Sequence, residues 1–153
     1  MLSSACKNAI RSILYLAMYS NEIKKIGVKK IAEDLETPQP FLSKLLQQLT
    51  KLELISSTKG PYGGFYLSKK DAENTIWSII KNIEGTSKFD QCFLGLSKCS
   101  DEDPCPIHFI VSPFKKELTD NFSNKTIAEY VKEIEQSGKV ISLKDFDILP
   151  EKS

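Results

Sequence analysis

The sequence predicts a mainly α-helical fold with a small β-hairpin, in the order of a winged helix-turn-helix. Two short amphipathic helical segments joined by a tight link are the first observation behind this prediction. A turn-rich stretch at residues 59–64, between two short strand-like runs, is the second. The third is charge: residues 1–70 hold 11 Lys and Arg against 5 Asp and Glu, whereas residues 71–153 hold 10 against 15. This asymmetry indicates nucleic-acid contact through the front half. The alternative is an α+β domain without that role.

Length and composition bound the class of protein. The 153 residues suit one domain, or one small domain with an appendage, and 41% hydrophobic residues suffice for a buried core. No apolar run approaches the ~20 residues that cross a bilayer, and the N-terminus lacks the features of a secretory signal. Four cysteines without an export signal indicate a reducing compartment, so we expect a cytoplasmic protein whose thiols bind metal or react. No nucleophile–base or phosphate-cradling motif is present, so we expect no enzymatic activity.

Three helices are predicted before the hairpin. The first begins at a Ser3 or Ser4 cap and runs to about Tyr19, because its apolar residues follow the helical period. Residues 28–35 form a second, shorter amphipathic helix. Prolines are tolerated only at the start of a helix, so those at positions 38 and 40 locate the start of the third. Its dense apolar face comprises Phe41, Leu42, Leu45, Leu46, Leu49 and Leu52.

The hairpin, called the wing below, comprises residues 54–67. Residues 54–57 predict one strand, residues 59–64 the turn, and residues 65–67 the returning strand. Residues 71–83 then predict a further helix.

Periodicity disappears from residue 84 to residue 106, where Gly, Ser, Asp, Pro and Cys dominate. Ser112 as a cap and Pro113 in the first turn predict a helix to about Phe122. Another helix opens at residue 124 or 125 and ends near Gly138, and residues 140–153 are expected to form an extended tail.

Three of the four cysteines lie in the irregular region, and the one histidine of the chain follows it at residue 108. Cys92, Cys99, Cys105 and His108 are spaced C-x6-C-x5-C-x2-H. Thiolates and an imidazole are ligands for iron–sulfur clusters or for zinc. Structural zinc usually uses closer pairs of cysteines, so the gaps of six and five residues fit zinc less well, and unrelated free thiols are a third alternative.

The third helix and the wing resemble those of the Rrf2 family of bacterial transcription regulators. The residues that carry this resemblance are 41–46, 54–57 and the wing sequence Lys59-Gly60-Pro61-Tyr62-Gly63-Gly64-Phe65-Tyr66-Leu67, together with the three-cysteine loop downstream. The resemblance covers residues 1–137. It implies a homodimer that binds DNA, with a long helix after the cysteines pairing the two subunits.

The resemblance also implies the cofactor. Cys92, Cys99, Cys105 and His108 match the ligands of a 2Fe–2S cluster in IscR-type members, although the first gap is one residue longer here. NsrR-type members hold a 4Fe–4S cluster with an aspartate of the first helix, and the matching position here is Asn8, a poorer ligand. CymR-type members lack the cluster, whereas this chain keeps three cysteines. We therefore expect a 2Fe–2S cluster.

The candidate DNA contacts lie on the third helix and the wing. The second helix of a helix-turn-helix enters the major groove, and the apolar face of this one turns Ser43 and Lys44 outward. Lys59 matches the family position that enters the minor groove. The DNA-contacting set predicted from the sequence is Gln39, Pro40, Ser43, Lys44, Gln47, Lys59 and Tyr62, with Arg11 as a phosphate contact. A two-fold dimer implies a pseudo-palindromic operator.

Together these observations divide the chain into three parts. Residues 1–83 form the winged helix-turn-helix domain, residues 84–110 the cysteine loop, and residues 111–153 the dimerisation helix, a following helix and a tail. The expected function is transcription regulation controlled by the cluster. The alternatives are a regulator with zinc or bare thiols in the same loop, and an iron–sulfur carrier protein that does not bind DNA.

Overall fold

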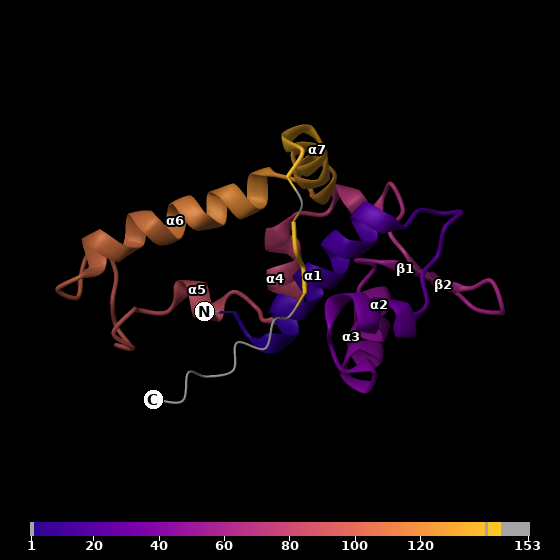
Figure 1. The fold of residues 1–153 in the computed structure, drawn as a ribbon. Helices are drawn as coiled ribbons and strands as arrows, with labels where there is room; N and C mark the ends of the chain where they lie inside the picture. Colours follow the sequence, from indigo (N-terminus) through magenta and orange to yellow (C-terminus); the bar gives the residue numbers. More distant parts are fainter. Residues whose placement is uncertain (1, 140, 145–153) are drawn as a thin grey trace, which may run out of the picture.

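The computed structural model describes residues 2–139 and 141–144, and it is mainly helical with one two-stranded antiparallel hairpin. A long helix, α6, extends from the remainder of the molecule as an arm, and α7 turns back beside α1 (Figure 1). The elements are α1 Ser4–Tyr19, α2 Val28–Leu35, α3 Gln39–Lys51, β1 Ser56–Thr58, β2 Gly64–Tyr66, the 3₁₀ turn η1 Asp71–Glu73, α4 Ile76–Ile83, α5 Ser87–Asp90, α6 His108–Asn124 and α7 Ile127–Ser137. Within the described residues, no helix is long and apolar enough to cross a membrane.

Helix α1 is the centre of the core. It begins where the Ser3 side chain accepts a hydrogen bond from the Cys6 amide, as the sequence predicted. Cys6, Ala9, Ile13 and Leu16 of its apolar stripe are fully buried, and the helix packs against α3, α4 and α7. Burial of each large aliphatic side chain of this kind contributes about 1.5–3 kcal/mol. The other elements are therefore arranged around one helix.

Helices α2 and α3 form the helix-turn-helix unit. Helix α2 ends at Glu36, which adopts the left-handed conformation with φ of 51°. Thr37 is buried in the turn, and its amide donates to the Ala32 carbonyl at 3.0 Å. Pro38 then occupies the N-cap of α3 and Pro40 its first turn, which confirms the start inferred from the prolines. The fully buried face of α3 comprises Leu42, Leu45, Leu46 and Leu49.

The wing is shifted by one or two residues from the prediction. Ser56 pairs with Tyr66 and Thr58 with Gly64, so Leu54 and Ile55 lie outside the ladder. They are buried instead, since the Leu54 amide donates to Leu49 O and closes the end of α3. Ile26 adds a third segment to the wing, because its amide and carbonyl both bond to Phe65, at 2.9 and 2.8 Å.

The single helix predicted over residues 71–83 is wrong, because the chain breaks there into η1 and α4. The buried Asp71 carboxylate accepts hydrogen bonds from the Ser56 hydroxyl at 2.6 Å and the Ser68 amide at 3.0 Å. Asn74 and Thr75 are extended, and Thr75 starts α4 with a capping box. The extended break lets the Asn74 carbonyl accept from the Ile127 amide at 2.9 Å, which ties α7 to this region.

The predicted start of α6 is also wrong. The helix begins at His108, four residues before the predicted cap Ser112, and Pro113 lies inside it. The first turn forms earlier because the Cys105 and Ile107 carbonyls accept bonds from the amides of His108, Ile110 and Val111. Pro113 lacks the amide for one main-chain hydrogen bond, yet α6 continues past it to Asn124, against the expectation that prolines lie only at a helix start.

Two smaller differences concern the segments on either side of α6. The irregular region contains the short helix α5, whose Phe89 is buried edge-on against Trp77 with ring centroids 5.1 Å apart. Helix α7 begins after its Thr126 cap, slightly later than the predicted residue 124 or 125, and its end at Gly138 agrees with the prediction. Of the predicted tail, residues 140 and 145–153 lie outside the described residues.

We expect Gly64→Ala to lower the free energy of unfolding by about 1–3 kcal/mol. A Cβ at Gly64 would lie 2.8 Å from the backbone of Ile26, and its φ of +152° strains any L side chain. The matched change Gly27→Ala meets nothing within 4 Å and has φ of −74°. It should cost less than about 1 kcal/mol. Urea unfolding followed by circular dichroism measures both, and equal losses would contradict this account of the wing.

Candidate metal centre and nucleic-acid interface

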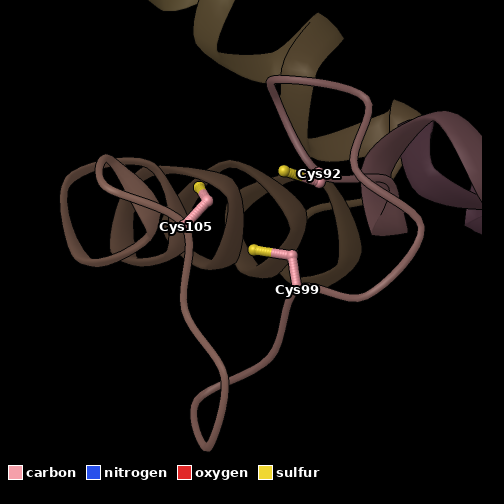
Figure 2. Close-up of side chains that lie close together, drawn as sticks. All are labelled: Cys92, Cys99 and Cys105. Carbon is pink, nitrogen blue, oxygen red and sulfur yellow. The ribbon is translucent and has the colours of Figure 1, made fainter.

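The cysteine loop brings three sulfur atoms together. The Sγ atoms of Cys92, Cys99 and Cys105 all lie within 4.8 Å of one another. Figure 2 shows the three side chains directed toward one another from separate turns of the loop. Cys105 is buried, Cys92 and Cys99 are half-buried, and all three are free thiols. Atoms ligating one tetrahedral centre through bonds of about 2.3 Å lie about 3.8 Å apart, so this group needs little rearrangement to hold a metal.

Local hydrogen bonds and neighbouring helices hold the loop in this shape. Gly95 adopts φ of +76°, and its amide donates to the Cys92 carbonyl at 2.9 Å. A second turn is closed by the Ser100 amide, which donates to the Asp103 carbonyl at 3.1 Å. The Lys115 ammonium on α6 also donates to the Gln91 carbonyl. The loop is therefore fastened to α6 on both sides of the sulfurs.

His108 lies at the edge of the sulfur group. Its Nδ1 atom is 3.2 Å from Cys99 Sγ, and its Nε2 atom is 2.8 Å from an Asp101 carboxylate oxygen. The structure thus brings the three predicted sulfur ligands together and places the predicted imidazole beside one of them. A cavity of about 280 Å³ adjoins the four side chains, and Phe89 and Lys115 contribute to its walls.

The backbone around the sulfurs favours charge on one of them. Hydrogen bonds from the backbone of Leu96 and then Leu94 lower the pKa of Cys92 to about 7, against an opposing effect of burial. For Cys99 a backbone bond from Cys105 acts to lower the pKa, but burial and the neighbouring Cys105 and Cys92 thiols raise it on balance. Because the thiolate is the form that binds metal, the lowered pKa of Cys92 favours metal binding by this sulfur.

The fourth cysteine is separate from this group. Cys6 is fully buried in the core on α1. Burial, and then the nearby Glu84 carboxylate, raise the pKa of its thiol to about 11. Its position is that of a core thiol, as its place on the apolar face of the first helix suggested.

The candidate nucleic-acid contacts occupy the exposed side of α3 and the turn of the wing. Gln39, Pro40, Lys44 and Gln47 are exposed on α3, opposite its buried leucines, and Ser43 is half-buried. At the wing, Lys59 is exposed and the Tyr62 side chain is 94% exposed. Helix α3 and the wing lie at the end of the molecule away from the arm of α6 (Figure 1).

Arg11, predicted from the sequence as a phosphate contact, makes several hydrogen bonds inside the protein. Its guanidinium donates to the Leu143 and Leu35 carbonyls, each at 2.6 Å, and to the Asn8 side chain at 2.5 Å. Arg11 therefore joins α1 to the end of α2 and to the segment at residues 141–144. These three bonds give Arg11 a structural role, which the sequence could not show because Leu143 lies 132 residues away.

Sequence reasoning also missed Asp101, the carboxylate that contacts His108. Three acidic residues, Asp101, Glu102 and Asp103, lie between the second and third cysteines. Spacing alone gave no means of choosing among them, since the choice depends on how the turn folds back on α6.

Comparison with known proteins shows matches over most of the chain. The model of the Rrf2 family, described as iron-dependent transcriptional regulators, matches residues 2–133. An inferred HTH-type transcriptional regulator of Aquifex aeolicus is 33% identical over 133 residues, which are 86% of this chain and 91% of that protein. The HTH-type transcriptional regulator IscR of Pectobacterium atrosepticum is 27% identical over 85% of this chain and 78% of its own length.

Solved structures share the fold at lower identity. The cysteine regulator CymR of B. subtilis superposes with a TM-score of 0.68 at 19% identity, covering 87% of this chain and 97% of that one. IscR of T. potens superposes with a TM-score of 0.67 at 20% identity, covering 92% and 93%. The helix-turn-helix, the wing, the long α6 and a family match over residues 2–133 lead to one conclusion. The chain belongs to the Rrf2 family of transcription regulators.

Proposed function

We propose that this regulator binds a pseudo-palindromic operator as a homodimer, under the control of an iron–sulfur cluster of the 2Fe–2S type. Cys92, Cys99, Cys105 and His108 would hold the cluster. The observation that carries the proposal is the convergence of three sulfurs beside an imidazole, in the loop that joins the winged domain to α6. The matching family model is described as iron-dependent, which agrees with iron as the metal.

The donor set of this loop, three cysteine thiolates and one histidine imidazole, favours an iron–sulfur cluster. Thiolates are the usual ligands of such clusters, and an imidazole in place of a thiolate is known to raise their potential. A first-helix carboxylate for a 4Fe–4S cluster is lacking, since Asn8 stands at that position. The Asn8 amide is buried and already bonded to the Ser4 carbonyl and Arg11. This supports the 2Fe–2S assignment over the 4Fe–4S one.

The exposed side of α3 would read the major groove and the wing the minor groove. Gln39 and Lys44 at the start of α3 have the side chains that read adenine and guanine. Lys59 projects from the wing, where a basic side chain favours a narrow A·T-rich groove. The basic excess of residues 1–70 supplies the attraction to phosphate that does not depend on sequence.

The cysteine loop connects the proposed sensor to the proposed dimer helix. Helix α6 begins at His108, and it presents Phe109, Ile110 and Phe114 with 60–76% of their surfaces exposed. Such an apolar face suits pairing with a second copy of α6. At its other end α6 packs on α4, which packs on α1. Cluster binding would order the residues between Cys92 and His108, and so bias the angle between the two recognition helices of the dimer.

A single tetrahedral metal in the same loop is a second candidate. The three sulfurs lie within 4.8 Å of one another with His108 beside them, which is the Cys₃His donor set of structural zinc. Zinc would make the loop a fixed structural element, whereas a cluster would make it a sensor. The metal and sulfide content of the protein separates the two.

Anaerobic isolation should yield coloured protein with about two irons and two sulfides per chain, the content of one 2Fe–2S cluster. Cys105→Ser should lose most of this iron, because it removes a ligand. The matched change Cys6→Ser, which alters the buried core thiol, should keep it. Absorption spectra with iron, zinc and sulfide analysis measure the outcome. Stoichiometric zinc without sulfide would establish the second candidate, and colourless, metal-free protein after reconstitution would exclude both.

Lys44→Ala should weaken binding to a selected operator by about 1–3 kcal/mol and relax the base preference at one position in each half-site. Lys132→Ala, which removes an exposed lysine of α7, should leave binding unchanged. Fluorescence anisotropy against duplexes enriched by this protein from a random pool measures both. Equal affinities for the parent and the Lys44 variant would remove α3 from the proposed interface.

Cluster-loaded and cluster-free protein should differ in operator affinity or operator choice by about tenfold or more, which corresponds to ~1.4 kcal/mol of coupling between the sites. Parallel anisotropy titrations under nitrogen, with iron content determined on the same samples, make the comparison. Superimposable curves would leave the DNA-binding proposal intact and end the proposal of control by the cluster.

A further inference from the structure

The His108 ring lies between a sulfur and a carboxylate, with one ring nitrogen facing each. We propose that Asp101 is a positioning residue that fixes the tautomer of His108, so that Nδ1 and not Nε2 is the nitrogen presented to the metal. This inference rests on the proposed function, because it specifies how the fourth ligand of that site is prepared. The two contacts that carry it are Nε2 to Asp101 at 2.8 Å and Nδ1 to Cys99 Sγ at 3.2 Å.

Hydrogen-bond chemistry decides which ring nitrogen carries the proton. An ionised carboxylate can only accept, so the Asp101 oxygen requires a hydrogen on Nε2. In a neutral imidazole the lone pair then lies on Nδ1. That atom faces the sulfurs. A lone pair directed at the sulfur group is what a metal ligand there must supply, so the Asp101 contact prepares the ring for binding.

The fold leaves the ring few other orientations. His108 is the first residue of α6, and its amide donates to the Cys105 carbonyl at 3.0 Å. The Phe109 ring stands edge-on to the imidazole, with centroids 5.1 Å apart and an interplanar angle of 88°. The imidazole side chain is 15% exposed, whereas that of Asp101 is 79% exposed. A mostly buried imidazole is thus in contact with a carboxylate that lies at the surface.

The turn at residues 100–103 explains why Asp101, of the three neighbouring acidic residues, is the one that contacts His108. The Ser100 amide donates to the Asp103 carbonyl, and the Asp103 amide donates to the Ser100 hydroxyl at 3.2 Å. Asp103 takes part through its backbone, and within the described residues its carboxylate makes no hydrogen bond or ion pair. The turn directs Asp101 back toward α6. Asp103 therefore offers a matched control, with the same side chain in the same turn and no contact with the ring.

A carboxylate partner of this kind also strengthens the ligand. It raises the basicity of the opposite nitrogen and removes the cost of orienting the ring, and loss of such a partner typically weakens metal binding by about 10–100-fold. Because the effect acts through His108, it is separate from the charge that an acidic loop contributes in general. Asp101→Ala and Asp103→Ala remove the same charge, so only the contact with the ring distinguishes them.

The metal-free protein provides the first test. His108 is the only histidine in the chain, so ¹⁵N-histidine labelling gives two ring-nitrogen signals with no overlap. The spectra are recorded over a series of pH values, and the tautomer is read where they show a neutral imidazole. The parent and Asp103→Ala should show the Nε2–H tautomer, and Asp101→Ala a shift toward a mixture. An Nδ1–H tautomer in the parent, or identical spectra for Asp101→Ala and the parent, would overturn the inference.

The metal-loaded protein provides the second test. The half-time of iron release to a chelator should shorten by about 10–100-fold in Asp101→Ala, remain unchanged in Asp103→Ala and be largely restored in Asp101→Glu. Equal release from the two alanine variants would assign the effect to charge and overturn the positioning role. If no iron is bound at all, the proposed function fails, while the tautomer measurement on metal-free protein still decides the inference.

Discussion

Burial of α1 is the constraint on which the other elements of this molecule depend. Its inward residues Cys6, Ala9, Ile13 and Leu16 are at most 1% exposed. Helices α3, α4 and α7 each pack on it, so the second helix of the helix-turn-helix, the helix before the cysteine loop and the last described helix are all positioned against α1. Arg11 extends from the same helix to carbonyls of α2 and of the segment at residues 141–144. Packed contacts through α1 therefore connect α4 and α7 to the helix-turn-helix.

The cysteine loop differs from this core in what stabilises it. Phe89 is its buried apolar anchor, packed against Trp77 of α4, and beyond that anchor Phe93, Leu94 and Leu96 are exposed. Its conformation rests on short-range turns and on the first turn of α6. Each ordered residue costs about 1–2 kcal/mol of backbone entropy, which so little burial offsets poorly. A metal that joined the three sulfurs would supply the missing stabilisation. Binding of the proposed cluster would therefore stabilise the segment that leads into α6.

The site combines two kinds of preparation for a metal. Backbone hydrogen bonds lower the pKa of Cys92, and the Asp101 carboxylate orients His108. Both act on ligands by fixing the charge or the lone pair before a metal arrives. Neither depends on residues of the winged domain. The sensing and DNA-reading parts of the proposed function are therefore open to separate change by substitution, and α4 and α6 form the connection between them.

The features that depend on local preference and periodicity could be predicted from the amino-acid sequence. It placed α1, α2 and α3 from their apolar period and their prolines, the wing from its glycines, and a thiol–imidazole loop from composition. Tertiary structure decided the features that depend on distant partners. The helix expected over residues 71–83 is broken, since Asp71 bonds to Ser56 and Asn74 to Ile127. Helix α6 begins at His108 because carbonyls of the loop accept hydrogen bonds from its first amides. Arg11 donates to the carbonyl of Leu143, a residue far away in the sequence. Asp101 contacts His108 because the turn at residues 100–103 brings it back toward α6. Local sequence carries propensities, but a hydrogen bond across 132 residues exists only after the chain has packed.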